Sequence, residues 1–475
     1  MPAEQSHAEI VAELTSRWPE HRPAPSLGRI RALTELLGDP QRSYPVIHLT
    51  GTNGKGSTAA MIESLLRADG LRTGRFTSPH VITVTERMSI DGEPISDERF
   101  DDVWREIEPY VALVDERQID GVSLTFFEII TAMAYAAFAD APVDVAVVEV
   151  GLGGAWDATN VADADVAVVT PIDLDHTQLL GRTITEIARE KAGIIKPGAH
   201  AILAGQSVEA AQVLLARCAE VGALPQREGV DFGVIDRRLA VAGQLIRLSG
   251  ADGPVDDIFL PLHGAHQAAN AGQALAAVEA FLGLKALHPD VVREGFAQVR
   301  FPGRLELVRR SPAVVLDAAH NPHGARAAAA AMTEAFGFAP LIGVVAVMAD
   351  KDARGVLEAF EEIMNHIVIT QVASTSRGMP AEALGELAEE VFGASRVTVV
   401  PRLDDAIERA VALAEADVVG SPGVLITGSV IAIGEARTLL VREEPVVVAA
   451  TRENLDNEWD ADYSEDGHET DWDWR

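Results

Sequence analysis

The feature that most constrains this fold is a regular alternation of short apolar runs with longer helical segments. The apolar runs are rich in β-branched residues and are predicted strands, at 46–49, 143–150, 164–170, 313–317, 341–347, 366–370, 397–400 and 423–427. Stretches rich in Ala, Leu and Glu are predicted helices between them, for example at 57–68, 128–138, 265–281 and 404–414. Such alternation is typical of βαβ units, and strands without a polar face are expected when helices cover both sides of a parallel sheet. The chain is therefore predicted to be an α/β protein.

A Pro-Gly break at 301–304 indicates how the 475 residues divide into domains. Residues 1–300 carry the motifs of a nucleotide site, and residues 301–441 contain five further strand–helix alternations. The segment 442–475 is rich in Asp and Glu and poor in aliphatic residues after Val448, so we expect an acidic, disordered tail. The alternative for this tail is a short docking motif around Trp459, Trp472 and Trp474.

The composition excludes several classes of partner. A formal charge of -33 opposes the wrapping of nucleic acid and binding to an anionic membrane. Cys218 is the only cysteine, which excludes an intramolecular disulfide and a cysteine cluster for zinc. The N-terminus lacks a basic stretch followed by an apolar run, and no apolar segment approaches the ~20 residues of a membrane helix. We therefore expect a cytoplasmic protein whose partners include neither nucleic acid nor membrane.

A glycine-rich turn lies between the first predicted strand and the helix that follows it. It consists of Gly51, Thr52, Asn53, Gly54, Lys55, Gly56 and Ser57. Glycines let backbone N–H groups turn toward a triphosphate, the helix N-terminus adds positive potential, and Lys55 can reach the β- and γ-phosphates. The turn departs from the strict Walker form, because Leu49 stands where the first glycine is expected and Gly56 precedes Ser57. A turn without a ligand needs no lysine between two glycines, so we interpret it as a phosphate loop that binds ATP.

Two potential metal ligands follow strands that are expected beside this loop. Glu149 lies near the end of one predicted strand, and His176 follows the next one. The carboxyl ends of parallel strands face the ligand crevice of an open α/β sheet. Mg²⁺ prefers hard oxygen ligands and keeps several waters, so one or two protein carboxylates suffice. Each residue alone could equally be structural, but the two together beside a phosphate loop indicate a Mg²⁺ site.

The phosphate loop and a series of further motifs resemble those of the Mur-ligase superfamily, and more narrowly of the folylpolyglutamate and dihydrofolate synthase family of bifunctional bacterial type. The motifs run in order over roughly residues 25–440: GTNGKGS at 51–57, TSPH at 77–80, ERM at 86–88, LTFFE at 124–128, VEVGLGG at 148–154, DATN at 157–160, DHT at 175–177, EKAGI at 190–194, HQ at 266–267, PGR at 302–304 and LDAAHNP at 316–322. The resemblance implies an N-terminal P-loop-type ATPase domain with a parallel sheet and a C-terminal Rossmann-like α/β domain.

The resemblance also assigns roles around the metal. It implies that Ser78, Glu149 and His176 bind Mg²⁺, the expected cofactor. It further implies that Lys191 is N-carboxylated by CO₂, which turns a cation into an anion and needs a neutral amine, hence a depressed lysine pKa. From the residues alone, Lys191 is a helix lysine near acidic neighbours, in a surface ion pair worth little.

On the ATP side, Asn270, Arg304 and Asp317 match positions that hold the nucleotide in the family. Arg304 lies at the predicted domain junction, where a cation can meet phosphates, and Asp317 ends a predicted strand, where it can accept from a ribose hydroxyl. The alternatives are a linker charge for Arg304 and a helix N-cap for Asp317. His320 is expected to position the reacting groups, which makes Lys55, Lys191 and His320 the predicted catalytic residues. The segment 350–352, Asp-Lys-Asp, resembles the motif on the family's glutamate side.

Two stretches resemble the walls of the family's pterin or folate pocket. They comprise Thr125, Phe126, Phe127 and Glu128, and Trp156, Asp157 and Ala158. Aromatic rings stack on flat heterocycles, although Phe126 and Phe127 would pass equally well as core residues. Ala155 stands where the family commonly has arginine, which leaves open how the pocket holds an anionic substrate.

The predicted reaction is the addition of L-glutamate to dihydropteroate, to the glutamate tail of reduced folates, or to both. The substrate carboxylate attacks the γ-phosphate of ATP to give an acyl phosphate and ADP, and the amine of glutamate then displaces phosphate. Positioning and charge neutralisation by Lys55, Arg304 and Mg²⁺ are expected to dominate catalysis. We expect a monomer. The alternatives are a cell-wall precursor amino-acid ligase of the same superfamily and a nucleotide-gated ATPase switch with a protein partner.

Overall fold

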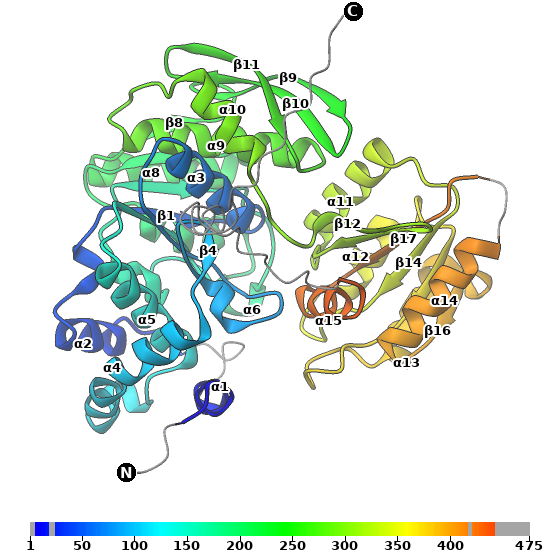
Figure 1. Cartoon of the computed structure of the whole chain (residues 1–475), viewed down its shortest axis with the longest axis horizontal. Helices are drawn as coiled ribbons and strands as arrows, with labels where there is room; N and C mark the ends of the chain where they lie inside the picture. Colours follow the sequence, from blue (N-terminus) through cyan, green and yellow to red (C-terminus); the bar gives the residue numbers. More distant parts are fainter. Residues whose placement is uncertain (1–4, 19–23, 417–419, 442–475) are drawn as a thin grey trace, which may run out of the picture. The chain divides into compact units, whose positions relative to one another are not determined.

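The computed structural model describes residues 5–18, 24–416 and 420–441 (Figure 1). All helices and strands of this part belong to the unit Met1–Leu440, which is distinct from the unit Val441–Arg475. The acidic segment 442–475, with its three tryptophans, lies outside the described residues, so the disordered tail stays a prediction. No helix in the described ranges is both long and apolar enough to cross a bilayer.

An eight-stranded sheet forms the first layer, in the strand order β4-β3-β2-β5-β1-β6-β7-β8. At one edge β3 is antiparallel to both of its neighbours, β2 and β4, whereas all the other neighbouring strands are parallel. The strands are β1 (Val46–Thr50), β2 (Thr73–Phe76), β3 (Met88–Ile90), β4 (Glu93–Pro94), β5 (Val145–Glu149), β6 (Val166–Val169), β7 (His200–Leu203) and β8 (Leu224–Arg227).

Helices cover both faces of this sheet. Successive side chains of a strand point to opposite faces, so each apolar strand packs against helices on both sides. Ile47 and Leu49 of β1 face one side, where α3, α9 and α10 pack. Val46 faces the other side, which α1, α2, α4 and α5 cover, and Ala167 of β6 packs there against α7 and α8. The helices are α1 (His7–Ser16), α2 (Gly28–Leu36), α3 (Lys55–Ala68), α4 (Asp97–Glu116), α5 (Phe126–Asp140), α6 (Thr177–Leu180), α7 (Ile184–Lys191), α8 (Val208–Val221), α9 (Ala265–Phe281) and α10 (Pro289–Ala297).

A three-stranded antiparallel sheet, β11-β10-β9, packs against α9 and α10 (Figure 1). Its strands are β9 (Gly233–Ala240), β10 (Gly243–Gly250) and β11 (Gly253–Leu260). The apolar-run pattern does not predict this sheet, because inward residues such as Ile246 and Leu248 alternate with outward Leu245 and Arg247. Such strands bury one face only, so they contain no continuous β-branched run.

A six-stranded sheet begins at Arg304, in the order β12-β13-β17-β14-β15-β16. All its neighbouring strands are parallel except β12 and β13. Its elements are β12 (Arg304–Arg310), β13 (Ala313–Asp317), α11 (Pro322–Ala335), β14 (Leu341–Val345), α12 (Ala353–Phe360), β15 (His366–Ile369), α13 (Ala381–Phe392), β16 (Val397–Val399), α14 (Leu403–Ala416), β17 (Gly423–Thr427) and α15 (Val430–Leu440). Helices α11 to α13 cover one face, and α14 and α15 cover the other.

The predicted α/β class is confirmed, with parallel strands in both large sheets. Each predicted strand is present, although several end one or two residues earlier than the apolar run suggests. The predicted domain boundary at residues 300 and 301 stays a prediction.

Candidate active site

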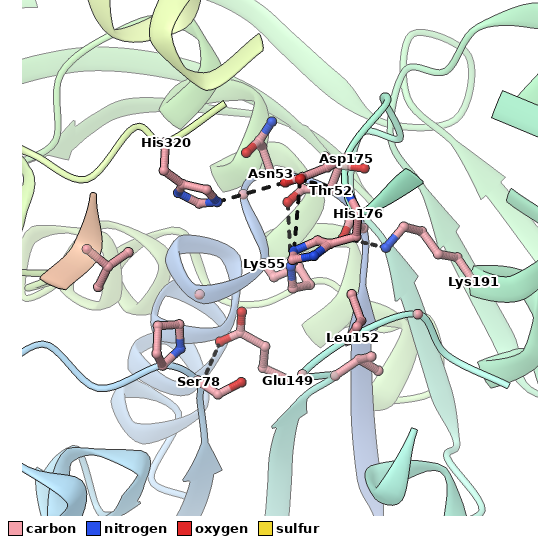
Figure 2. Close-up of a pocket in the computed structure, with 18 of the residues that line it drawn as sticks. Thr52, Asn53, Lys55, Ser78, Glu149, Leu152, Asp175, His176, Lys191 and His320 are labelled. Carbon is pink, nitrogen blue, oxygen red and sulfur yellow. Dashed lines mark hydrogen bonds and ion pairs between the residues drawn. The ribbon is translucent and has the colours of Figure 1, made fainter. Parts of the chain in front are cut away.

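Turns that leave the carboxyl ends of parallel strands meet at one cavity of about 160 Å³ (Figure 2). β1 leads into the loop 51–54, β2 leads to Ser78, β5 ends at Glu149, and β6 leads to His176. We call this the phosphate-loop cavity. The predicted site residues that line it are Thr52, Asn53, Gly54, Lys55, Gly56, Ser57, Ser78, Glu149, His176, Lys191, Arg304 and His320. Asn270 and Asp317 do not line it.

The backbone conformation of the loop requires glycine at two of its positions. Gly51 has a φ of +149°, and a Cβ on it would lie 1.8 Å from Oγ1 of Thr170. Gly54 has a φ of +91°, and a Cβ there would lie 2.8 Å from Oδ1 of Asn270. Side chains are excluded at both positions by these contacts and by the left-handed backbone. Asn270 of α9 therefore borders the loop directly, although it does not face the cavity.

Two lysines reach the same carbonyl oxygen of this loop. Lys55 is the first residue of α3, and its Nζ lies 3.2 Å from the oxygen of Gly51. Lys191 is the last residue of α7, and its Nζ donates to that oxygen at 2.8 Å. Only 3% of Lys191 is exposed, so the alternative of a surface ion pair is wrong. Burial, with repulsion from Lys55, lowers the pKa of Lys191 to about 7.

Glu149 is the buried carboxylate of the cavity, and its Oε2 lies 3.3 Å from the backbone N–H of Ser78 (Figure 2). Burial raises the pKa of Glu149, against the attraction of Lys55. The positive charges near Glu149 therefore do not compensate fully for its removal from water. A raised pKa of this kind in a cleft is typical of a functional carboxylate.

His176 is the second predicted metal ligand in this cavity. Partial burial and the nearby ammonium of Lys351 lower the pKa of His176 to about 4, so its imidazole is neutral and can act as a ligand. No three His, Cys, Asp or Glu side chains of the described residues form a metal-binding group by themselves. A cation would therefore also need the Ser78 hydroxyl, water or substrate oxygens.

A network around Asp175 forms one wall, and the residues alone predict no role for it. Asp175 accepts from Nζ of Lys351 at 2.7 Å and from Nδ2 of Asn321 at 3.1 Å. Nζ of Lys351 also lies 3.1 Å from Nε2 of His176. Burial raises the pKa of Asp175, but His176 and Lys351 outweigh burial and hold it well below its usual range. The position of Asp175 after a strand end, in the ligand crevice, is the signal that could have found it.

His320 presents a free nitrogen lone pair near this network. Its Nδ1 lies 3.0 Å from the carbonyl oxygen of Ala318. A carbonyl only accepts, so Nδ1 carries the hydrogen and Nε2 is the acceptor. Partial burial lowers the pKa of His320 to about 4, which keeps the ring neutral. Nε2 lies 3.9 Å from Oδ2 of Asp175, beyond a direct hydrogen bond.

Arg304 and Asp317 are paired across β12 and β13. Arg304 lines the phosphate-loop cavity, so the alternative of a linker charge is wrong. The carboxylate of Asp317 accepts from the backbone N–H groups of Leu305 at 3.1 Å and Ala319 at 2.9 Å. The alternative of a helix N-cap is also wrong for Asp317, because Asn321 caps α11.

A second, larger cavity of about 620 Å³ shares part of its wall with the first. We call it the aromatic cavity. All seven residues of the two predicted acceptor stretches line it: Thr125, Phe126, Phe127, Glu128, Trp156, Asp157 and Ala158. Phe126 and Phe127 are the first two residues of α5 and also pack in the hydrophobic core. Their rings therefore line the cavity and contribute to the core at the same time. Asp157 is 3% exposed, and burial raises its pKa to about 6.

The cations of the aromatic cavity come from other positions than residue 155. Ala155 does not line the cavity, and a Cβ on Gly193 would lie 2.4 Å from the Cβ of Ala155. Arg87, Lys351 and Arg377 do line the cavity. Positive charge for an anionic ligand is thus present without an arginine at 155.

Two family descriptions match the chain: the Mur ligase middle domain over residues 49–278, and the Mur ligase glutamate ligase domain over residues 303–430. The dihydrofolate synthase/folylpolyglutamate synthase of Mycobacterium tuberculosis is 50% identical over 453 residues, which cover 90% of this chain and 93% of that protein. The chain belongs to the folylpolyglutamate and dihydrofolate synthase family.

Members of the folylpolyglutamate and dihydrofolate synthase family are ATP-dependent ligases. A solved structure of Mycobacterium tuberculosis folylpolyglutamate synthase complexed with ADP and AMPPCP has a TM-score of 0.88 and 49% identity, covering 92% of this chain and 99% of that one. Escherichia coli FolC in complex with DHPP and ADP has a TM-score of 0.79 and 32% identity, covering 92% of this chain and 99% of that one. The family fold therefore extends over the described residues on both sides of residue 300.

Proposed function

We propose that this chain activates the carboxylate of dihydropteroate or of a reduced folate with ATP and couples it to L-glutamate. The observation that carries the proposal is the wall shared by the two cavities. Seven residues line both of them: Ser78, Pro79, Gly151, Leu152, His176, His320 and Val430. A carboxylate held in the aromatic cavity would therefore lie next to the γ-phosphate held at the phosphate loop.

Each step then follows from the groups at this shared wall. The acceptor carboxylate attacks the γ-phosphorus, the bond from phosphorus to the β,γ-bridging oxygen breaks, and an acyl phosphate and ADP form. Lys55, the first residue of α3, and Arg304 neutralise the phosphate charge that this transfer redistributes. The amine of glutamate attacks the acyl carbon and phosphate leaves, with the amine proton passing to a base. We assign Nε2 of neutral His320, which lines both cavities, as the acceptor of that proton.

The site residues fit Mg²⁺ as the cofactor. The carboxylate of Glu149 is a hard ligand, burial raises its pKa, and a further cation would stabilise its charged form; Ser78, which carries a hydroxyl, lines the same cavity. When bound there, Mg²⁺ would neutralise part of the phosphate charge. Neutral His176 is the remaining candidate ligand, once its nitrogen is released from Lys351.

We also assign Lys191 as a carboxylated lysine. Its enclosed amine and its pKa of about 7 supply the neutral nucleophile that attacks CO₂, forming an N–C bond and releasing one proton. The resulting carbamate would be an anion facing the phosphate-loop cavity beside Lys55.

The glutamate substrate would bind where Lys351 and Arg377 meet the aromatic cavity. Both residues line it, and Nη2 of Arg377 donates to Oδ1 of Asp350 at 3.2 Å. Cations at this end suit the two carboxylates of glutamate. A cytoplasmic monomer is part of the proposal: a single buried cysteine supports the compartment, and the lining of both cavities by residues of one chain is compatible with a monomer.

Two rival functions make different predictions. A cell-wall precursor ligase needs room for a nucleotide-linked sugar, whereas Phe126, Phe127 and Trp156 suit a flat ring. An ATPase switch would turn over nucleotide without any small acceptor.

ADP release should be measured over dihydropteroate, tetrahydrofolate and a cell-wall nucleotide, each with glutamate. We expect ADP only with a pteridine and glutamate present; ADP release without an acceptor favours the switch, and release only with the cell-wall nucleotide favours the rival ligase.

A further inference from the structure

Arg29 of α2 and Glu128 of α5 form a buried ion pair. Arg29 is 1% exposed and Glu128 is 4% exposed. Nε of Arg29 lies 3.1 Å from each carboxylate oxygen. Charges this far from water persist only when they are paired and hydrogen-bonded, so the pair fixes the two helices relative to each other.

Glu128 connects the pair to the aromatic wall of the cavity. Its Oε2 accepts from the backbone N–H of Thr125 at 2.8 Å, and its own N–H donates to Oγ1 of Thr125 at 3.2 Å. This capping box sets the start of α5. The next two residues, Phe126 and Phe127, line the aromatic cavity. Both oxygens of Glu128 therefore accept from protein donors at the edge of the cavity.

Arg29 connects the same pair to a second wall. Its Nη2 donates to the carbonyl oxygen of Ala24 at 2.5 Å. Its Nη1 lies 3.8 Å from Asp120, which accepts from the hydroxyl of Ser26 at 2.5 Å. Ala24 and Ser26 line the aromatic cavity, whereas Arg29 does not. One guanidinium thus holds two separate stretches of the cavity wall.

We propose that Arg29 is a positioning residue that sets the affinity for the acceptor without touching it. Through Glu128 it holds the start of α5, and through Ala24 it holds the segment before α2. Glu128, which itself lines the aromatic cavity, connects Arg29 to α5. The inference rests on the proposed function only in taking a pteridine as the acceptor.

The first test is Arg29→Lys. An ammonium keeps the charge but lacks the planar fork that binds two carboxylate oxygens and a carbonyl at once. We expect the KM for dihydropteroate to rise about tenfold or more, while the KM for ATP changes by less than about twofold. An unchanged KM for dihydropteroate in a folded variant overturns the proposal.

A matched control separates positioning from general loss of stability. Oε2 of Glu63 lies 2.6 Å from Nε of Arg75 in another buried ion pair, and neither residue lines either cavity. Glu63→Gln should lower the melting temperature but leave the KM for dihydropteroate unchanged. An equal rise of this KM in both variants assigns the effect to loosening of the fold and overturns the proposal.

A double variant covers the case in which Arg29→Lys fails to fold. Arg29→Met with Glu128→Gln leaves no uncompensated charge inside and keeps an acceptor for the N–H of Thr125. It should fold and still show the raised KM for dihydropteroate, because the carbonyl of Ala24 has lost its donor. A wild-type KM in the double variant contradicts the role of Arg29.

A measurement without substrate distinguishes this inference from the proposed function. Backbone amide hydrogen exchange in Arg29→Lys should accelerate at 24–30 and 122–130 and stay unchanged at 45–57. Unchanged exchange in the first two segments overturns the inference. If the wild-type protein releases no ADP with any pteridine, the proposed function fails, and the exchange pattern still decides whether Arg29 holds the two walls.

Discussion

Nζ of Lys191 lies 2.8 Å from the carbonyl oxygen of Gly51, which ties the end of α7 to the start of the phosphate loop. The amine is enclosed, and Lys55 reaches the same carbonyl. With a pKa of about 7, about half of the Lys191 amines are neutral near neutral pH. An ordinary surface lysine would hold a neutral fraction about a thousandfold smaller. This relationship makes the carboxylation of Lys191 testable.

Lys191→Ala should be nearly inactive, because it removes the anion proposed beside the phosphates. Formate or acetate should partly restore ADP release by occupying the vacated oxygen site. Lys191→Arg is the matched control, since its guanidinium stays charged and fills the space. Severe loss without rescue by any carboxylate would leave the modification unsupported.

The pH dependence of the modification has a definite sign. The neutral fraction of Lys191 rises as the pH increases through about 7, so the carboxylated fraction should rise with it at fixed dissolved CO₂. Intact mass at neutral pH, with and without bicarbonate, reports the modification independently of turnover. A free ammonium at Lys191 in an active, metal-loaded crystal would falsify the assignment.

Lys55→Ala should abolish ligation, because it removes the charge that meets the β- and γ-phosphates at the start of α3. The fold should persist, since Lys55 is only half-buried and the carbonyl of Gly51, which it contacts, keeps Lys191 as a donor. Circular dichroism checks the fold and ADP release checks activity. Near-normal turnover with an unchanged KM for ATP would contradict the phosphate-loop assignment.

Glu149→Gln should weaken Mg²⁺ binding and lower kcat by about a hundredfold or more, because it replaces the buried anionic ligand with a neutral amide. The N–H of Ser78 keeps an acceptor, so the local backbone should be preserved. Titration of the Mg²⁺ dependence of ADP release measures the effect. An identical Mg²⁺ dependence in the two proteins contradicts the role of Glu149 as a ligand.

His48 should contribute a distinct pH dependence of stability. Burial lowers its pKa to about 3, so the unfolded chain binds more protons below about pH 6.5 and stability falls as the pH decreases. The loss between about pH 7.5 and about pH 5 is about 2 kcal/mol. His48→Gln retains a partner for Oγ1 of Thr159 but should lack this loss.

The measurement for His48 is the urea midpoint of both proteins at the two pH values. Buried carboxyls that share no hydrogen-bond partner with His48, such as Glu279, whose pKa is raised to about 7, act with the opposite sign, but they are present in both proteins and cancel in the difference. An equal pH effect on the two midpoints would show that His48 does not titrate between folded and unfolded states.

Removal of the segment 442–475 should leave catalysis intact, because no matched motif lies in it. The truncation should end at Val441, after the last described helix. A loss of rate of about tenfold or more, with an unchanged circular dichroism spectrum, would assign the tail to the site.

The α/β class and the placement of the phosphate loop follow from the sequence by itself, since apolar periodicity and glycine turns act over a few residues. Lys55 illustrates this, because the strand before it and the helix after it are both local patterns. The same holds for Glu149 at the end of β5. The sheet β9–β11 escaped prediction because its strands bury one face and lack an apolar run.

Only the tertiary structure decided the electrostatic state of the site. Nothing near Lys191 in the sequence shows that it is buried against Gly51, and its acidic neighbours suggest a surface lysine instead. Likewise, Asp175 pairs with Lys351, and Arg29 pairs with Glu128, through contacts between segments that are far apart in the sequence. Burial and the charges within a few ångströms set a pKa and a partner, and both depend on how strands far apart in the chain are ordered in a sheet.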